Sequence, residues 1–151
     1  MIYRVVLAVV LATALVAATL GPIDDARRQR TSAMVSDQAS EIERVADTLL
    51  ETDDPLDGPG ARRVVTLRVP TRTWTSGGVE RVSLRPPTDQ APARLSWLLT
   101  DGQPRTRQLP GVPLRTPDGG PVVLRRGGRH RLVLSLDGRP GAPVLTVRRL
   151  K

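Results

Sequence analysis

Residues 35–50 read VSDQASEIERVADTLL, and apolar side chains recur through them at intervals of four, three, four and three residues. This spacing is typical of a heptad and predicts an amphipathic helix with one narrow apolar stripe. The stripe consists of Val35, Ala39, Ile42, Ala46 and Leu49. It either packs on the protein's own β-domain or is a helix interface with a partner, in a homo-oligomer or a filament.

The helix that carries this stripe is predicted to cover residues 23–52, which contain no proline or glycine. Pro22 suits the first turn of a helix, because its missing N–H has no helical partner there. Asp24 and Asp25 follow, where the positive end of the helix dipole favours carboxylates. The Gly21-Pro22 pair therefore predicts a break between this helix and whatever precedes it.

The preceding residues 1–20, MIYRVVLAVVLATALVAATL, contain one charged side chain, Arg4. As a helix, residues 5–20 span about 24 Å, and counting from Met1 the length reaches roughly the 30 Å of a bilayer's hydrocarbon core. The best signal-peptidase site, Val16 and Ala18, is mediocre. Residues 1–22 are therefore expected to be a retained membrane anchor rather than a cleaved signal peptide.

The orientation of this anchor is less clearly marked, because basic residues are nearly balanced on its two sides. The count by itself favours a cytoplasmic C-terminal side. Against it stand the signal-like appearance of the run and the lack of a cytoplasmic-looking function downstream. We expect the bulk of the chain outside the cytoplasm.

Beyond the amphipathic helix, residues 53–61 are rich in Pro, Gly and Asp and predict a linker. From Arg62 to the end, apolar and polar residues alternate in short segments separated by turn residues, which predicts antiparallel strands with one buried face. The apolar positions of these segments are Val65, Leu67 and Val69; Val82 and Leu84; Leu95, Trp97 and Leu99; Val122 and Leu124; Leu132, Leu134 and Leu136; Leu145 and Val147. The predicted fold class is α+β: an N-terminal transmembrane helix, an amphipathic helical stalk, and a small antiparallel β-sandwich or open barrel over 62–151.

Glycine pairs mark the expected turns of this β-domain. Gly127-Gly128 predicts a two-residue hairpin, because glycine adopts the positive φ of primed turns without strain. Asp101-Gly102 and Asp137-Gly138 predict further turns, the second of them widened by Arg139-Pro140-Gly141. Phenylalanine is absent from the chain, so Trp97 is expected at the centre of the core, whereas Trp74 is either a rim residue of the core or an exposed contact.

Charge is divided between the two halves of the chain. Residues 1–60 hold five basic and ten acidic residues, a net charge of −5, and residues 61–151 hold eighteen basic and five acidic residues, a net charge of +13. The densest basic cluster, and the candidate polyanion contact, is Arg125, Arg126, Arg129, His130 and Arg131. Codon bias in a GC-rich genome and an ordinary solvated strand face are the favoured explanation of the arginine excess, and a binding surface is the alternative.

The chain lacks most of the equipment of enzymes. It has no cysteine, and His130 is its only histidine, so thiol nucleophiles, disulfides and multi-histidine metal sites are excluded. No phosphate-binding loop or dinucleotide motif is present. Nucleic-acid binding through stacked bases is disfavoured by the scarcity of aromatic residues. The sequence therefore predicts no catalytic residue, no cofactor, no metal and no small-molecule substrate.

The layout of an apolar helix, an amphipathic helix and a small β-head resembles type IV pilin-like and pseudopilin subunits. The segments MIYRVVLAVVLATALVAATLGPIDDARRQR and ARRVVTLRVPTRTWTSGGVERVSLR also resemble a small uncharacterised membrane-protein family of halophilic archaea. This resemblance implies a non-enzymatic, membrane-anchored subunit with protein partners in a pilus or secretion-type assembly. The alternative is a tethered or secreted module that binds a polyanion, either nucleic acid or an acidic glycan.

Overall fold

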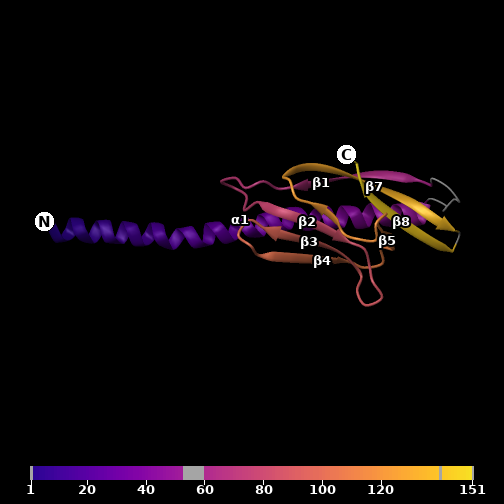
Figure 1. The fold of residues 1–151 in the computed structure, drawn as a ribbon. Helices are drawn as coiled ribbons and strands as arrows, with labels where there is room; N and C mark the ends of the chain where they lie inside the picture. Colours follow the sequence, from indigo (N-terminus) through magenta and orange to yellow (C-terminus); the bar gives the residue numbers. More distant parts are fainter. Residues whose placement is uncertain (1, 53–59, 140, 151) are drawn as a thin grey trace.

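The structure is a computed structural model that describes residues 2–52, 60–139 and 141–150, with the backbone alone for Thr19 and Leu20. Most of the predicted linker, residues 53–59, lies outside the described residues. In the described part, one long helix leads into a β-sandwich, and its C-terminal half packs along one side of that sandwich (Figure 1). The predicted α+β fold class is confirmed.

The helix α1 (Ile2–Thr52) is continuous, so the predicted break at Gly21-Pro22 is wrong. Pro22 cannot donate to the carbonyl oxygen of Ala18, yet its fixed φ of about −65° is itself helical. A single missing hydrogen bond therefore leaves the helix intact. At about 1.5 Å per residue, its 51 residues span roughly 76 Å.

Two four-stranded sheets form the β-sandwich. The first sheet has the order β1-β7-β8-β5, and the second has the order β4-β3-β2-β6. All pairings are antiparallel except that of β5 with β8. The strands are β1 (Arg62–Val69), β2 (Val79–Arg85), β3 (Ala93–Leu99), β4 (Pro104–Leu109), β5 (Leu114–Arg115), β6 (Val122–Leu124), β7 (Gly128–Arg139) and β8 (Ala142–Arg149). The described residues thus form a sandwich of two separate sheets and not a closed barrel.

The apolar stripe of α1 packs inside this sandwich. Val35, Ala39, Ile42, Ala46 and Leu49 are at most 2 % exposed and share one core with the inward side chains of both sheets. The helix lies along β1 and β4, the strands that end the two sheets on the same side of the sandwich. The first of the two sequence-based alternatives is therefore the right one, and the stripe is not available as an interface with a partner helix.

Polar contacts from α1 also cover both of these strand edges. The side-chain amide of Gln38 donates to the backbone carbonyl oxygen of Arg68 in β1 at 3.0 Å and accepts a hydrogen bond from the backbone N–H of the same residue. On β4, the Arg107 guanidinium donates to the Ser36 backbone carbonyl oxygen at 2.7 Å and to the Glu43 carboxylate at 2.9 Å. The helix thereby protects two edges that could otherwise pair with another chain.

The predicted hairpin at Gly127-Gly128 is wrong. The strand before it, β6, pairs with β2 in the second sheet, whereas the strand after it, β7, pairs with β1 and β8 in the first sheet. The glycines therefore lie in a connection that crosses between the sheets. Gly128 still has the positive φ, +113°, on which the prediction rested.

The other two predicted turns have different outcomes. At Asp101-Gly102 the β3–β4 hairpin is confirmed, with the Gly102 N–H donating to the Leu99 carbonyl oxygen at 2.9 Å. The second predicted turn starts too early, because Asp137-Gly138 lies inside β7. The chain reverses between Arg139 and Ala142, which face each other in the register, in the widened part of that turn. The apolar alternation of the sequence identified the flanking strands but not the residue at which they reverse.

Candidate functional site

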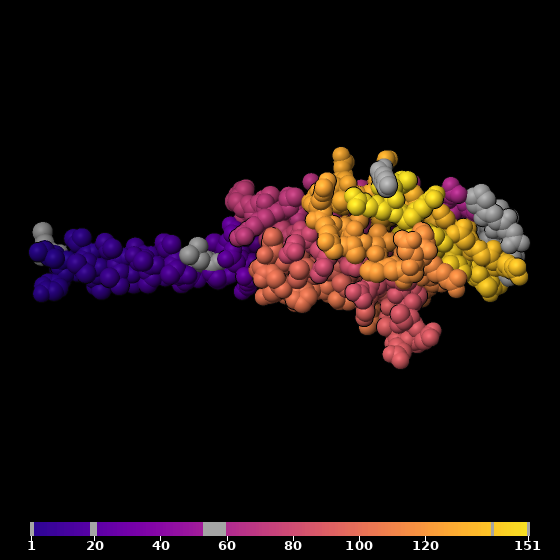
Figure 2. Space-filling view, viewed as in Figure 1, coloured from indigo at the N-terminus to yellow at the C-terminus, as the bar shows by residue number. Residues whose placement is uncertain are grey.

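The N-terminal part of α1 is long and apolar enough to cross a membrane, and its apolar span is not buried against any other part of the described chain. Figure 2 shows it as a bare rod that leaves the compact head. Its large apolar side chains, from Ile2 to Val16, are exposed. The head covers α1 only from about residue 24 onward, where Asp24 and Arg27 lie beside the loop between β1 and β2. The chain thus has an uncovered apolar rod joined without interruption to a folded head.

The predicted basic cluster is only partly assembled. Arg125 and Arg126 are exposed in the connection between β6 and β7, and Arg129 and Arg131 point outward from β7. His130 is 8 % exposed, and its ring Nε2 lies 2.6 Å from the Arg126 carbonyl oxygen. Successive strand residues point to opposite faces, so His130 points toward the core. Its inclusion in the contact surface is therefore wrong, while the four arginines remain accessible.

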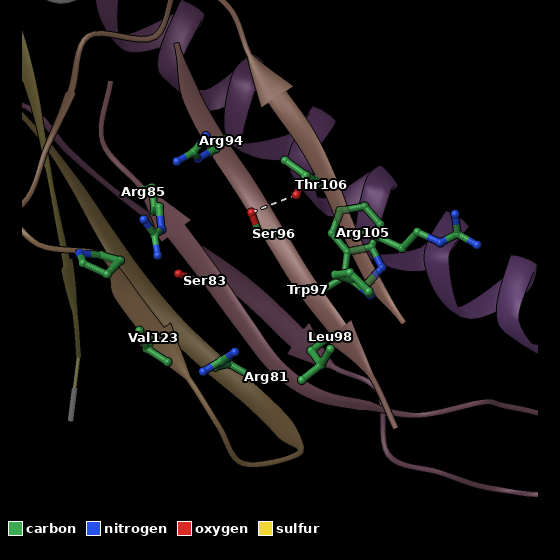
Figure 3. Close-up of a pocket in the computed structure, with 12 residues that line it drawn as sticks. Arg81, Ser83, Arg85, Arg94, Ser96, Trp97, Leu98, Arg105, Thr106 and Val123 are labelled. Atoms are coloured by element: carbon green, nitrogen blue, oxygen red, sulfur yellow. Dashed lines mark hydrogen bonds between the residues drawn. The ribbon is translucent and has the colours of Figure 1, made fainter. Parts of the chain in front are cut away.

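A second basic surface, which the sequence analysis did not single out, lies on the outer face of the second sheet (Figure 3). We call it the arginine–hydroxyl face. Its residues are Arg81, Ser83, Arg85, Arg94, Ser96 and Thr106. They line a hollow of about 510 Å³, whose other lining side chains include Leu98 and Val123.

Strand register sets the arrangement of this face. Ser83 of β2 is opposite Ser96 of β3, which is opposite Thr106 of β4, so three hydroxyl groups form a row across the sheet. The Thr106 hydroxyl donates to Ser96 Oγ at 3.1 Å. Two residues further along β2, on the same face of the sheet, Arg85 is directly opposite Arg94. The face therefore combines a hydroxyl row with a pair of adjacent guanidinium groups.

This pairing of like charges has an energetic consequence. Like charges directly opposite each other on a sheet are destabilising by a fraction of a kcal/mol. In the described part of the chain, no acidic side chain lines the hollow, and the side chains of Arg81, Arg85 and Arg94 make no hydrogen bond or ion pair. Guanidinium groups suit bidentate binding of carboxylate, phosphate or sulfate. An anion on this face would relieve the repulsion and occupy the free donors.

Only part of this face was visible in the sequence. Ser83, Arg85 and Ser96 alternate with the apolar positions of their segments, so the period-two pattern by itself places them on the solvent-facing side of the strands. It did not show that Arg85 is opposite Arg94, because the pairing of β2 with β3 depends on long-range register. The sequence signal for the site was thus the alternation of hydroxyl and arginine residues on two neighbouring strands.

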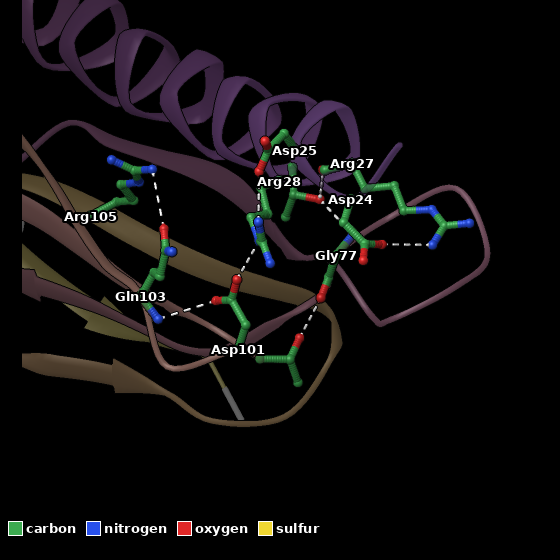
Figure 4. A network of polar contacts seen from close by, with 10 residues as sticks. Asp24, Asp25, Arg27, Arg28, Gly77, Asp101, Gln103 and Arg105 are labelled. Atoms are coloured by element: carbon green, nitrogen blue, oxygen red, sulfur yellow. Dashed lines mark hydrogen bonds and ion pairs between the residues drawn. The ribbon is translucent and has the colours of Figure 1, made fainter. Parts of the chain in front are cut away.

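A separate polar network joins the head to α1 (Figure 4). The Arg28 guanidinium donates to the carboxylates of Asp101 and Asp25, and both contacts raise its pKa. The backbone N–H of Gln103 donates to Asp101 at 3.1 Å. That hydrogen bond, followed by the one from Arg28, lowers the pKa of the Asp101 carboxyl. The network holds the β3–β4 turn against the helix.

Among the residues that the structure describes, no three His, Asp or Glu side chains lie together in a way that could hold a metal ion. The polar groups that do gather on the head are arginines and hydroxyls. Their chemistry suits the binding of anions.

A family model described as a domain of unknown function (DUF7311) matches residues 2–150, and the chain belongs to this family. The match covers both the apolar rod and the head. No curated protein and no solved structure matches the chain.

Proposed function

We propose that this DUF7311 protein is a non-enzymatic, membrane-anchored subunit of pilin-like layout, with its β-head outside the cytoplasm and in contact with other proteins of a pilus or secretion-type assembly. The observation that carries the proposal is the division of α1 into an uncovered apolar half and a half buried in the head. Such a helix is both an anchor and a structural part of the domain it anchors.

Retention of the anchor is supported by the continuity of α1. The predicted cleavage site at Val16 and Ala18 lies inside a regular helix, whereas proteolysis concentrates at exposed loops and termini. The break expected at Gly21-Pro22 would have set the chain apart from the pilin-like layout, and a continuous α1 removes that objection. Family membership extends over nearly the whole chain, so the rod and the head occur together in this family.

Contacts with partners are assigned to the outer surfaces of the head, because the apolar stripe is used internally. The arginine–hydroxyl face is the best candidate, since a carboxylate of an acidic partner protein would pair with Arg85 and Arg94. The non-enzymatic character rests on the absence of cysteine and on the inward position of the single histidine, His130.

The test is the N-terminal sequence of the native protein, together with membrane fractionation and protease treatment of intact cells. We expect an N-terminus at or before Arg4, resistance of the protein to carbonate extraction, and digestion of the head by external protease. A soluble protein that begins after Ala18 would refute the anchor. A membrane-bound protein whose head resists external protease until the cells are opened would refute the orientation.

The alternative function, a tethered polyanion-binding module, is favoured by the free guanidinium groups on both sheets. Arg68 and Arg129 are opposite each other on the first sheet, as Arg85 and Arg94 are on the second. Binding to a duplex polyanion should weaken with salt, with a slope of about −0.9 per phosphate contact in a plot of log K against log salt concentration.

Two sets of variants separate the alternatives. Under polyanion binding, replacing Arg125, Arg126, Arg129 and Arg131 with glutamine should reduce retention on DNA or an acidic polysaccharide and flatten its salt dependence. If the arginine–hydroxyl face instead binds a partner protein, the Arg85→Gln, Arg94→Gln double variant should release that partner. The four-arginine variant described first should then leave the complex intact. Unchanged retention of the first set on a polyanion column would refute the alternative function.

A further inference from the structure

The connection between β1 and β2, residues 70–78, lies at the end of the head from which the apolar part of α1 emerges (Figure 1). It carries Trp74, whose side chain is 82 % exposed. The chain has only three aromatic residues; Trp97 is buried and Tyr3 lies at the start of α1. Trp74 is thus the single exposed aromatic side chain of the described head, and its position relative to the anchor calls for an explanation.

The position of this connection is set by hydrogen bonds to the helix. The Gly77 N–H donates to the hydroxyl of Thr31 at 3.0 Å, and that hydroxyl also lies 3.1 Å from the hydroxyl of Ser76. Thr31 is fully buried, so the contact is shielded from water. Next to it, the backbones of Thr73 and Ser76 bond to each other in both directions, at 3.1 and 3.4 Å. Trp74 therefore lies in a closed turn clamped to α1.

The clamp fixes the turn at a defined height along the anchor. Residues 2–20 span about 28 Å as a helix, which matches the hydrocarbon core, and residue 24 follows about 6 Å further on. Arg72 and Thr73 line the same small pocket as Asp24, so the turn reaches that level of the helix. The headgroup layer on each side of the core is about 5–8 Å thick. The turn therefore meets the headgroup layer if α1 crosses the bilayer.

The charges around the turn fit lipid phosphates. Arg72 lies in the connection itself, and Arg30 lines a pocket with the other side of the turn. Neither side chain has a hydrogen bond or ion pair within the described residues. Tyr3 and Arg4 form a similar pair of an aromatic and a basic residue at the other end of the apolar span. Tryptophan and tyrosine are enriched at both membrane–water interfaces.

We infer that the turn of residues 73–76 is a second membrane contact, with the Trp74 indole in the headgroup layer and Arg72 beside lipid phosphates. This inference rests on the proposed membrane anchor. The contact stops the head from tilting freely about the point where α1 emerges, and so orients both outer sheet faces relative to the membrane.

The test uses the full chain in vesicles of phosphatidylcholine with one quarter phosphatidylglycerol. Lipids brominated near the headgroup should quench the emission of Trp74 more strongly than lipids brominated near the chain ends. Trp97 is enclosed in the head, so its emission reports folding in the same sample. The Trp74→Phe variant is the matched control and should lose the quenching while keeping the Trp97 emission.

The outcomes separate this inference from the proposed function. A protein that resists carbonate extraction but whose Trp74 emission is unaffected by either brominated lipid would overturn the second contact and leave the anchor in place. A protein that carbonate extracts from the vesicles would refute the anchor itself. In the Arg72→Gln variant, we expect Trp74 quenching to lose its dependence on phosphatidylglycerol, and an unchanged dependence would contradict the role of this guanidinium group.

Discussion

Replacing Ile42 with alanine should unfold the head more easily and should not dissociate an oligomer. Ile42 is 0 % exposed and lies among core side chains of both sheets. The change removes three buried carbons, worth about 2.4 kcal/mol at about 0.8 kcal/mol each. The cavity adds about 1–2 kcal/mol, because α1 is tied to both sheet edges and cannot close the gap. The free energy of unfolding should therefore fall by about 3–4 kcal/mol.

The measurement is urea unfolding of the full chain in detergent micelles, followed by the fluorescence of buried Trp97. With a slope of about 1–3 kcal/mol per molar urea, the midpoint should fall by about 1–4 M. Met34→Ala is the matched control, since Met34 is on the same helix but 39 % exposed. Its effect should stay within about 0.5 kcal/mol.

A different pair of results would refute this reasoning. If Ile42→Ala unfolded at the same urea concentration as the parent protein, the side chain would not be part of the core. If the same variant also had a smaller molar mass by light scattering, the apolar stripe would face another copy of the chain, as in the alternative reading of the sequence.

Three further changes test other parts of the structure. In Gly60→Ala the new Cβ would lie 2.0 Å from a backbone carbonyl oxygen of β7, so we expect a loss of about 1–3 kcal/mol in urea unfolding, whereas Gly120→Ala, with no neighbour within 4 Å, should be neutral. Arg107→Met should lower the free energy of unfolding by about 1.5–3 kcal/mol, because it removes hydrogen bonds made by a charged group. In a double-mutant cycle, Glu43→Gln should lower that free energy less in the Arg107→Met protein than in the parent protein. The pKa of Asp101 is lowered in the folded protein, so its contribution to stability is present above the ordinary value of 3.8 and is lost as the pH falls through the lowered pKa. Acid unfolding monitored by circular dichroism should therefore depend less on pH below about 3.8 in Asp101→Asn than in the parent protein; equal pH dependence of the two would contradict the lowered pKa of Asp101, which the Gln103 N–H and then Arg28 produce.

Local patterns in the sequence predicted much of the fold correctly. The alternation around Val65, Leu95 and Leu145 identified strands β1, β3 and β8, and their apolar residues are buried as expected. Strands β4 and β5 were missed because β4 buries few apolar side chains and β5 is only two residues long. A pattern of period two needs several buried positions before it can be recognised.

One error arose where two segments far apart in the sequence had to be matched, and another arose at a single site within a helix. Gly127-Gly128 has the local properties of a hairpin turn, but the strands on its two sides pair within different sheets. At Gly21-Pro22 the residue types favour a helix boundary, whereas the flanking turns continue the helix through it. Local chemistry thus limited which conformations were available without deciding between them.

The candidate site shows the same division. The sequence alone shows that arginine is in excess in residues 61–151 and that arginines alternate with the apolar, core-facing positions of the strands. Other features of the site depend on strand register and on helix packing. They are the pairing of Arg85 with Arg94, the inward position of His130 and the hydrogen bonds that hold the turn of Trp74 against α1.

By itself, the sequence determined that this protein has an apolar N-terminal span, a helix with one apolar stripe, and a basic β-domain. These properties belong to single segments, because side-chain periodicity and hydropathy are local. The packing of the head, by contrast, shows that the stripe closes the sandwich and which arginines share a surface. Those results depend on contacts between distant segments, whose free energies are set by the packing of the whole head.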